Sequence, residues 1–122
     1  MQHRPNDQCG LLQNNQLIFI SKAKEQYQLS TTIWLKKYDL DNVPIFFSSS
    51  YEEKNKIALE QKVDYMIDDK IPVLRSMDTN IKKIWFCTDI KKIFGLAKFE
   101  LQFFNSLIVA KNWYEVTSVF DL

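Results

Sequence analysis

Glycine is scarce in this sequence. Gly10 and Gly95 are the only two glycines among 122 residues, whereas average usage predicts about eight or nine. Neither the G-x-G-x-x-G loop of dinucleotide-binding proteins nor the G-x-x-x-x-G-K loop of nucleotide triphosphatases can be assembled from them. Glycine-rich phosphate loops are therefore excluded.

Cysteine and histidine are also rare, with two cysteines and one histidine in the chain. Cys9 and Cys87 do not form a Cys-x-x-Cys spacing, so a zinc site and a disulfide framework are both disfavoured. We expect Cys87 to be a small buried strand residue. His3 has no serine or cysteine pattern around it, which argues against a nucleophilic triad. A reducing, cytoplasmic location fits this composition.

Charge of one sign is not in excess, because 16 Lys and Arg residues face 15 Asp and Glu residues. The lysine pairs 36–37, 82–83 and 91–92 are scattered, so no basic stripe points to nucleic acid. The longest apolar runs, such as Leu17–Ile20, are far shorter than the roughly 18 residues that span a bilayer. We therefore expect neither nucleic acid nor a membrane as a partner.

Short apolar runs alternate with longer segments of helical period, which is typical of βαβ units and a mainly parallel sheet. Two capping-box spacings, Ser50 with Glu53 and Asn112 with Glu115, mark helix starts. The expected strands are 16–21, 43–47, 63–67, 81–87 and 106–110. The expected helices are 22–38, one after Ser50, a short one near Pro72 and 112–120, with 88–105 as an irregular connection that includes a helical turn.

Several chemically useful side chains follow the expected strands, where ligands bind in open α/β sheets. The hydroxyl of Ser21 can donate to a phosphate oxygen beside a helix N-terminus, although serine there is also a favoured N-cap. Lys54 and Lys56 fall at the positive end of a helix dipole, which an anion would relieve, unless they are solvated surface lysines. Asp68 and Asp69 offer adjacent carboxylates for Mg²⁺, with a turn and helix cap as the structural alternative.

The order of five features is more specific than any of them alone. They are a strand ending in serine, a helix ending in Trp-Leu, a lysine, an Asp-Asp pair after an apolar strand and a closing Asn-Trp-Tyr-Glu-Val helix. In this chain they are Phe19–Ser21, Thr32–Leu35, Lys54, Val63–Asp69 and Asn112–Val116. Together they resemble the haloacid dehalogenase-like (HAD) superfamily of phosphatases, nearest its 5′-nucleotidase (deoxy, pyrimidine, C-type-like) subgroup.

The resemblance implies a Rossmann-like, mainly parallel sheet and Mg²⁺-dependent hydrolysis of a phosphomonoester, for example a nucleoside monophosphate, through an aspartyl-phosphate. By that resemblance, Ser21 and Lys54 hold the phosphoryl group as catalytic and phosphate-binding residues. Lys56 is the alternative for the lysine role. Asp68 and Asp69 would be the metal ligands.

The family's first motif, an apolar strand followed by the nucleophilic Asp-x-Asp, is missing. It should lie upstream of Leu17, yet residues 1–16 hold a single aspartate, Asp7. The sequence Asp39-Leu40-Asp41 follows an expected helix and is typical of a turn. The resemblance therefore implies that residues 17–122 form an incomplete HAD-like core that lacks its first, central strand. Residues 1–16 would be an N-terminal tail or the remnant of a cap segment.

Two functions follow as hypotheses. The first is a phosphatase or nucleotidase domain that is inactive alone and is completed by the missing strand, either because the chain is truncated or because a second polypeptide supplies it. The second is a non-catalytic module that binds a phosphorylated ligand or a protein. A gap between the strands that end in Ser21 and in Asp68 would also favour pairing with another chain, as a homo-oligomer or with a complementing polypeptide.

Overall fold

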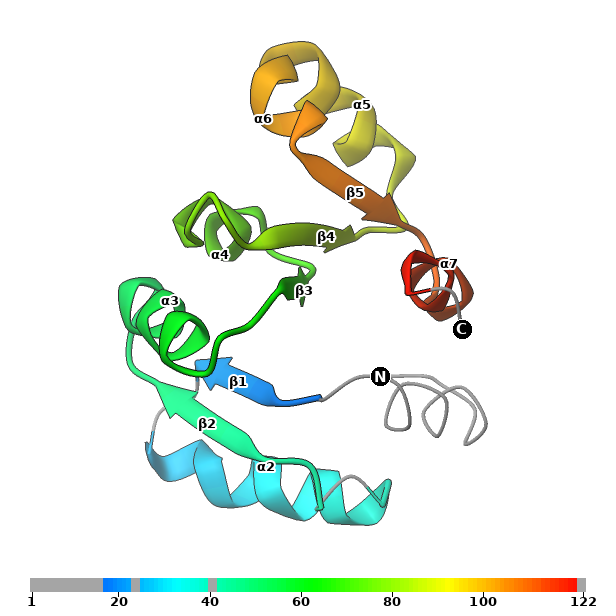
Figure 1. The fold of residues 1–122 in the computed structure, drawn as a ribbon. Helices are drawn as coiled ribbons and strands as arrows, with labels where there is room; N and C mark the ends of the chain where they lie inside the picture. The colour runs from blue at the N-terminus through cyan, green and yellow to red at the C-terminus, as the bar shows by residue number, and fades with distance from the viewer. Residues whose placement is uncertain (1–16, 23–24, 40–41, 121–122) are drawn as a thin grey trace.

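The computed structural model describes residues 17–22, 25–39 and 42–120, and the tail expected over residues 1–16 lies outside them. These residues form an α/β fold, as expected (Figure 1). The elements are β1 (Phe19–Lys22), α2 (Glu25–Lys37), β2 (Ile45–Ser48), α3 (Tyr51–Glu60), β3 (Tyr65–Asp68), α4 (Ile71–Ser76), β4 (Lys82–Phe86), α5 (Ile90–Phe99), α6 (Leu101–Asn105), β5 (Leu107–Ala110) and α7 (Trp113–Val119). No helix in these ranges is both long and apolar enough to cross a membrane.

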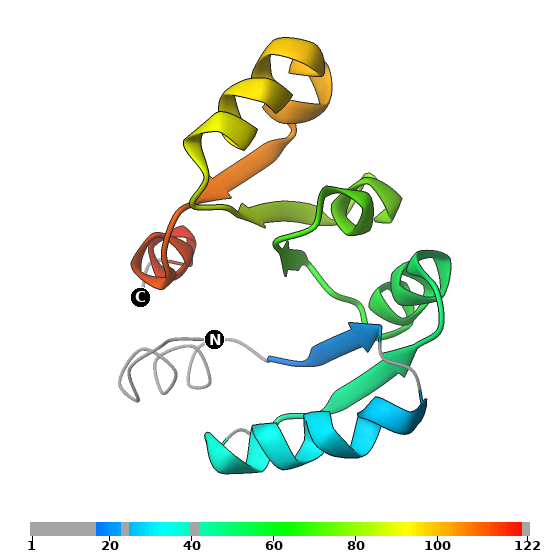
Figure 2. The same ribbon diagram turned by 180° about the vertical axis from the view of Figure 1, so that it is seen from behind.

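The strands form two parallel sheets instead of one. One sheet pairs β1 with β2, and the other has the order β3-β4-β5. In both views the strands follow the order β2, β1, β3, β4, β5, and among the described residues no strand lies between β1 and β3 (Figures 1 and 2). Among the described residues, the sheet is thus divided between β1 and β3.

One hydrophobic core nevertheless joins the two sheets. Ala58 of α3 and Met66 of β3 are buried in it, and Ile20 of β1 packs against it. A second cluster lies on the other face of the β3-β4-β5 sheet, where Val116 of α7 packs with Ile84. The two faces follow from the alternation of side chains along each strand.

Both expected capping boxes are confirmed. The hydroxyl of Ser50 accepts the backbone N–H of Glu53 at 3.1 Å, and the Glu53 carboxylate accepts the N–H of Ser49 at 3.0 Å. The side-chain oxygen of Asn112 likewise accepts the N–H of Glu115 at 2.8 Å. Each bond satisfies a backbone donor that a helix start would otherwise leave unpaired, so α3 and α7 begin at these residues.

The expectation of an irregular connection over residues 88–105 was wrong, because α5 and α6 occupy most of that segment. The carboxylate of Asp89 caps α5 by accepting the N–H of Lys91 at 3.0 Å. Only one side of α5 is buried, at Ile93, while Phe94 and Phe99 are exposed. Aromatic residues on the solvent side therefore hid the helical period in the sequence.

Candidate functional site

An ion pair connects helix α3 to the end of strand β3. The ammonium of Lys54 lies 3.2 Å from Oδ2 of Asp68, and the two side chains are only 9% and 12% exposed. The other carboxylate oxygen, Oδ1, accepts the backbone N–H of Lys70 at 2.8 Å. Because α3 follows β2 and Asp68 ends β3, this pair brings the carboxyl ends of both sheets together.

Lys54, and not Lys56, takes part in this site. Lys54 is 7% exposed, whereas Lys56 is an exposed residue. Two positions along an α-helix are about 200° apart around its axis, so these lysines point in nearly opposite directions. The structure therefore places Lys54, and not Lys56, beside Asp68.

Ser21 does not lie at a helix N-terminus, and both the helix-start position and the ordinary N-cap expected for it were wrong. Strand β1 continues through Lys22, which pairs in register with Ser48, and α2 begins only at Glu25. The ammonium of Lys22 lies 4.7 Å from the centre of the Tyr51 ring, at the first residue of α3. Ser21 is therefore near the same end of the sheets as Lys54, but the hydrogen bonds and ion pairs of the described residues do not link it to the Lys54–Asp68 pair.

Ser48 is a further residue of interest at the end of β2. It is 3% exposed, and its hydroxyl is a buried polar atom with no hydrogen-bond partner in the described part of the chain. Leaving such a group unpaired costs about 1–3 kcal/mol, so an oxygen-rich ligand that reached it would be stabilised. Nothing in the sequence singled out Ser48, because burial is not visible in the sequence.

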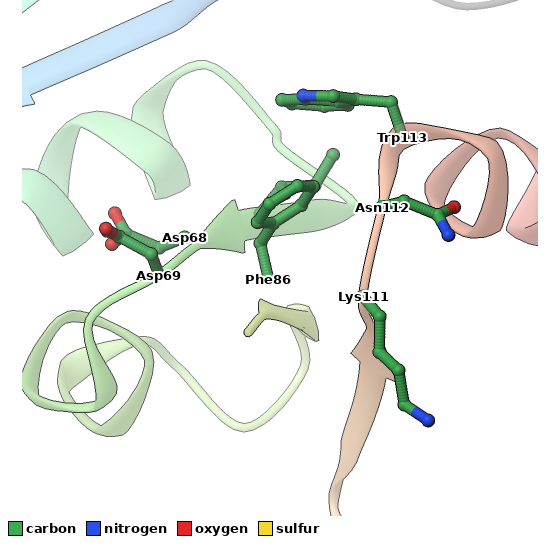
Figure 3. Close-up of a pocket in the computed structure, with 7 residues that line it drawn as sticks. Asp68, Asp69, Phe86, Lys111, Asn112 and Trp113 are labelled. Atoms are coloured by element: carbon green, nitrogen blue, oxygen red, sulfur yellow. The ribbon is translucent and has the colours of Figure 1, made fainter. Parts of the chain in front are cut away.

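An open cleft of about 620 Å³ lies beyond the carboxyl ends of β3, β4 and β5 (Figure 3). Its lining consists of Ile67, Asp68, Asp69, Phe86, Lys111, Asn112 and Trp113. The two carboxylates stand at one end, and the side chain of Lys111 points away from them (Figure 3). The rings of Phe86 and Trp113 pack against each other with centres 5.0 Å apart. The cleft is thus acidic at one end and aromatic at the other.

Asp68 and Asp69 fit a metal site only in part. Among residues 17–22, 25–39 and 42–120 there is no cluster of three or more acidic, histidine or cysteine side chains that could hold an ion. Asp69 is exposed, and its backbone carbonyl accepts the indole N–H of Trp85 at 3.2 Å. Since Mg²⁺ prefers six oxygen ligands but often takes only one or two carboxylates, the remaining ligands would have to come from water or a bound ligand.

Two other residues with potentially reactive side chains, Cys87 and Lys83, have structural roles. Cys87 is buried, as expected, and follows β4. Lys83 is also buried, and its ammonium donates to the backbone carbonyls of Asp78 and Ile81, both at 3.1 Å. Burial lowers the pKa of Lys83 below its ordinary value, and the nearby carboxylate of Asp78 partly offsets this effect. Lys83 lies at the start of β4, away from the carboxyl ends of the strands.

Asp39, the first residue of the Asp39-Leu40-Asp41 sequence, lies in a turn after α2. Its φ angle is 58°, a left-handed conformation that aspartate tolerates better than most residues. Leu40 and Asp41 lie outside the described residues. At Asp39 the structure therefore agrees with a helix-ending turn.

Fold and site together define an α/β protein with a polar site at the carboxyl ends of parallel strands. Comparison with protein-family models, with curated proteins and with solved structures found no match for this chain. Functional inference therefore rests on the geometry of Lys54, Asp68, Asp69 and Ser48.

Proposed function

We propose that this chain is an incomplete Mg²⁺-dependent phosphatase core of the HAD-like type, nearest the 5′-nucleotidases, which binds a phosphorylated ligand but does not hydrolyse it alone. The observation that carries the proposal is the contact between Lys54 and Asp68. The family resemblance assigns these residues to the phosphoryl group and to the metal, two roles that must be performed side by side. Fourteen positions separate them in the sequence, yet their charged atoms are 3.2 Å apart.

The electrostatics of Lys54 support an anionic ligand. Its ammonium sits in the first turns of α3, where the helix dipole is already positive, and it is nearly buried. Asp68 compensates one positive charge but also accepts a backbone N–H. A phosphoryl group beside this pair would gain a charge-assisted hydrogen bond from Lys54.

Mg²⁺, where bound, would neutralise charge on the phosphoryl oxygens. Asp68 and Asp69 are the residues that would hold it, with the remaining ligands from water and phosphate. The described residues include no Asp-x-Asp after a strand, so the covalent step of the family has no nucleophile among them. We therefore expect ligand binding without turnover.

Hydrolysis and binding assays test this proposal separately. p-Nitrophenyl phosphate and nucleoside 5′-monophosphates, each with Mg²⁺, should give no turnover above background. Calorimetric titration with inorganic phosphate or a nucleoside monophosphate should show binding. Turnover by this chain alone would contradict the missing nucleophile.

Matched lysine variants locate the binding site. Lys54→Met should weaken phosphate binding by roughly 10- to 100-fold, because a hydrogen bond to a charged group contributes about 1.5–3 kcal/mol. Lys56→Met removes the same charge from the exposed side of the same helix and should bind phosphate normally. Equal affinities for the two variants would place any phosphate site elsewhere.

A non-catalytic binding module is the second candidate. It is favoured by the contacts of Asp68, because each of its two carboxylate oxygens already has a partner within the protein, the ammonium of Lys54 and the N–H of Lys70. Phosphate binding that is unchanged by Mg²⁺ would support this function over the incomplete phosphatase. Absence of any phosphate binding would leave a protein-binding role.

A further inference from the structure

Helix α5 presents a largely apolar side to solvent. Ile93 and Leu96 lie on its inner side and pack in the core. On its outer side, Phe94 and Phe99 are 68% and 78% exposed, and Ile90 is exposed as well. The helix lies at one end of the molecule, opposite β1 and β2 (Figures 1 and 2). Grouped exposed apolar side chains mark interaction surfaces, whereas single ones need no explanation.

Exposed lysines lie among these apolar side chains. Lys91 and Lys98 are seven residues apart, so they lie on one stripe of the helix, about 10 Å apart along its axis. That stripe runs between Phe94 on one side and Phe99 on the other. The ammonium of Lys98 lies 5.3 Å from the centre of the Phe99 ring, and Lys92 is exposed next to Phe99. The outer face of α5 thus combines aromatic surface with three positive charges.

The acidic residues at the two ends of α5 are already engaged. The carboxylate of Asp89 caps the helix by accepting two backbone N–H groups. The carboxylate of Glu100 lies 2.7 Å from the guanidinium of Arg75. No ion pair of the described residues involves any of the three lysines. Residues 1–16 contain one acidic residue, Asp7, so their composition does not supply three counter-charges either.

Gly95 leaves an open space at the centre of this face. It lies one helical turn after Lys91 and one turn before Phe99. A Cβ atom at this position would meet no heavy atom of the described chain within 4 Å, apart from its two neighbours and the backbone of its own helix. Its φ angle is not positive, so no turn requires glycine there. Glycine weakens a helix interior relative to alanine, and close approach of a partner would explain its presence.

We propose that the outer face of α5, centred on Gly95, docks an acidic amphipathic helix of a partner protein. A small apolar side chain of the partner would enter the space at Gly95, and its apolar neighbours would cover Phe94 and Phe99. Carboxylates seven residues apart on the partner would pair with Lys91 and Lys98, which have the same spacing. Amphipathic helices bind in this way through anchors at i, i+3, i+4 and i+7.

The positions of the lysines distinguish this partner from other occupants. A second copy of the chain would bring its own α5 lysines to the face, and like charges would oppose the contact. A bilayer favours a helix with an apolar side and cations on the opposite or flanking side. Lys91 and Lys98 lie between Phe94 and Phe99 instead, so insertion of both rings would carry the ammonium groups toward hydrocarbon. The inference does not depend on the phosphate site at Lys54.

Peptide titration, followed by NMR of the backbone amides of the full chain, tests the proposal. The probe is the heptad Glu-Leu-Ala-Ala-Leu-Glu-Gln repeated three times, which places carboxylates seven residues apart beside an apolar stripe. Its control has lysine in place of every glutamate and keeps the same apolar residues. The acidic peptide should shift the amide signals of residues 90–99, with weaker binding at higher salt, and the basic peptide should not.

Two variants and a matched control locate the docking face. Gly95→Gln fills the open space without adding charge, so it should weaken binding about tenfold. The same variant should raise the urea unfolding midpoint, since glutamine favours a helix more than glycine does. Lys91→Gln combined with Lys98→Gln should weaken binding about fivefold, as expected for two exposed ion pairs. The same double change at Lys36 and Lys37, exposed lysines of α2, should leave binding unchanged.

Several results would overturn the proposal. Equal binding of the acidic and basic peptides would show apolar contact without charge recognition. Wild-type affinity in Gly95→Gln or in the α5 lysine variant would place the peptide elsewhere. Shifts of the α5 amides that grow with chain concentration alone would make a second copy the occupant. Failure of the acidic peptide to bind would also refute the docking face, and binding to phosphatidylserine vesicles in that case would identify a lipid surface instead.

Discussion

Replacing Lys54 by methionine should lower the free energy of unfolding by about 3 kcal/mol, because it leaves the buried carboxylate of Asp68 without a counter-ion. Both side chains are about nine-tenths buried, at 9% and 12% exposure, so water screens the pair poorly. Breaking a buried pair typically costs about 3–5 kcal/mol. The lower end of this range applies because the Asp68 carboxylate still accepts the backbone N–H of Lys70 at 2.8 Å in the variant. Methionine preserves most of the apolar stem, so little packing is lost.

A double-mutant cycle separates this charge effect from packing. Asp68→Asn in the Lys54→Met background removes the unpaired charge and should recover much of the lost stability, with a coupling energy of about 1–3 kcal/mol. Lys56→Met is the matched control, and as a surface change it should stay within about 0.5 kcal/mol of the wild type. The assay is urea unfolding followed by tryptophan fluorescence, since Trp85 is 3% exposed in the fold. Equal midpoints for the two lysine variants, or no recovery with Asn at position 68, would refute the reasoning.

Three further predictions concern the core, a helix start and pH. Leu74→Ala should cost about 2–5 kcal/mol in thermal unfolding, because Leu74 is fully buried. Phe99→Ala, at a 78% exposed position, should change stability by less than about 0.5 kcal/mol, and similar losses for both would contradict the assigned core. Ser50→Ala should lose about 1 kcal/mol in urea unfolding, since it removes the α3 cap, and an unchanged midpoint would show that the cap contributes nothing. Stability should rise with pH between the lowered pKa of Lys83 and the ordinary lysine value of 10.5, because the unfolded chain then binds the extra proton. Urea midpoints across that range should lose this slope in Lys83→Met, and an identical slope would assign the effect to another group.

Local signals in the sequence were enough to predict most elements. The capping boxes that begin α3 and α7 depend on contacts only three residues apart, so their spacing alone identified them. The strands were found as short apolar runs, with errors of a few residues at their ends. Helix α5 was missed because its exposed Phe94 and Phe99 obscured the apolar period. Where solvent-facing residues are apolar, the pattern no longer reports burial.

The candidate site was predictable in part. The order of residues indicated Ser21, Lys54, Asp68 and Asp69, but it could not choose between Lys54 and Lys56. That choice depends on which side of α3 faces the end of β3, a contact between segments 14 positions apart. The unpaired hydroxyl of Ser48 was not predictable either, because its significance comes only from burial.

The sequence by itself determined the α/β class and the mainly parallel strands, since both follow from short apolar runs that alternate with segments of helical period. Only the tertiary structure decided that the strands form two sheets joined by side chains, with Lys54 and Asp68 paired at their common end. The physical reason is that strand pairing and ion pairing depend on through-space distance. The identity of neighbouring residues along the chain does not specify the through-space distance between segments that are far apart in the sequence.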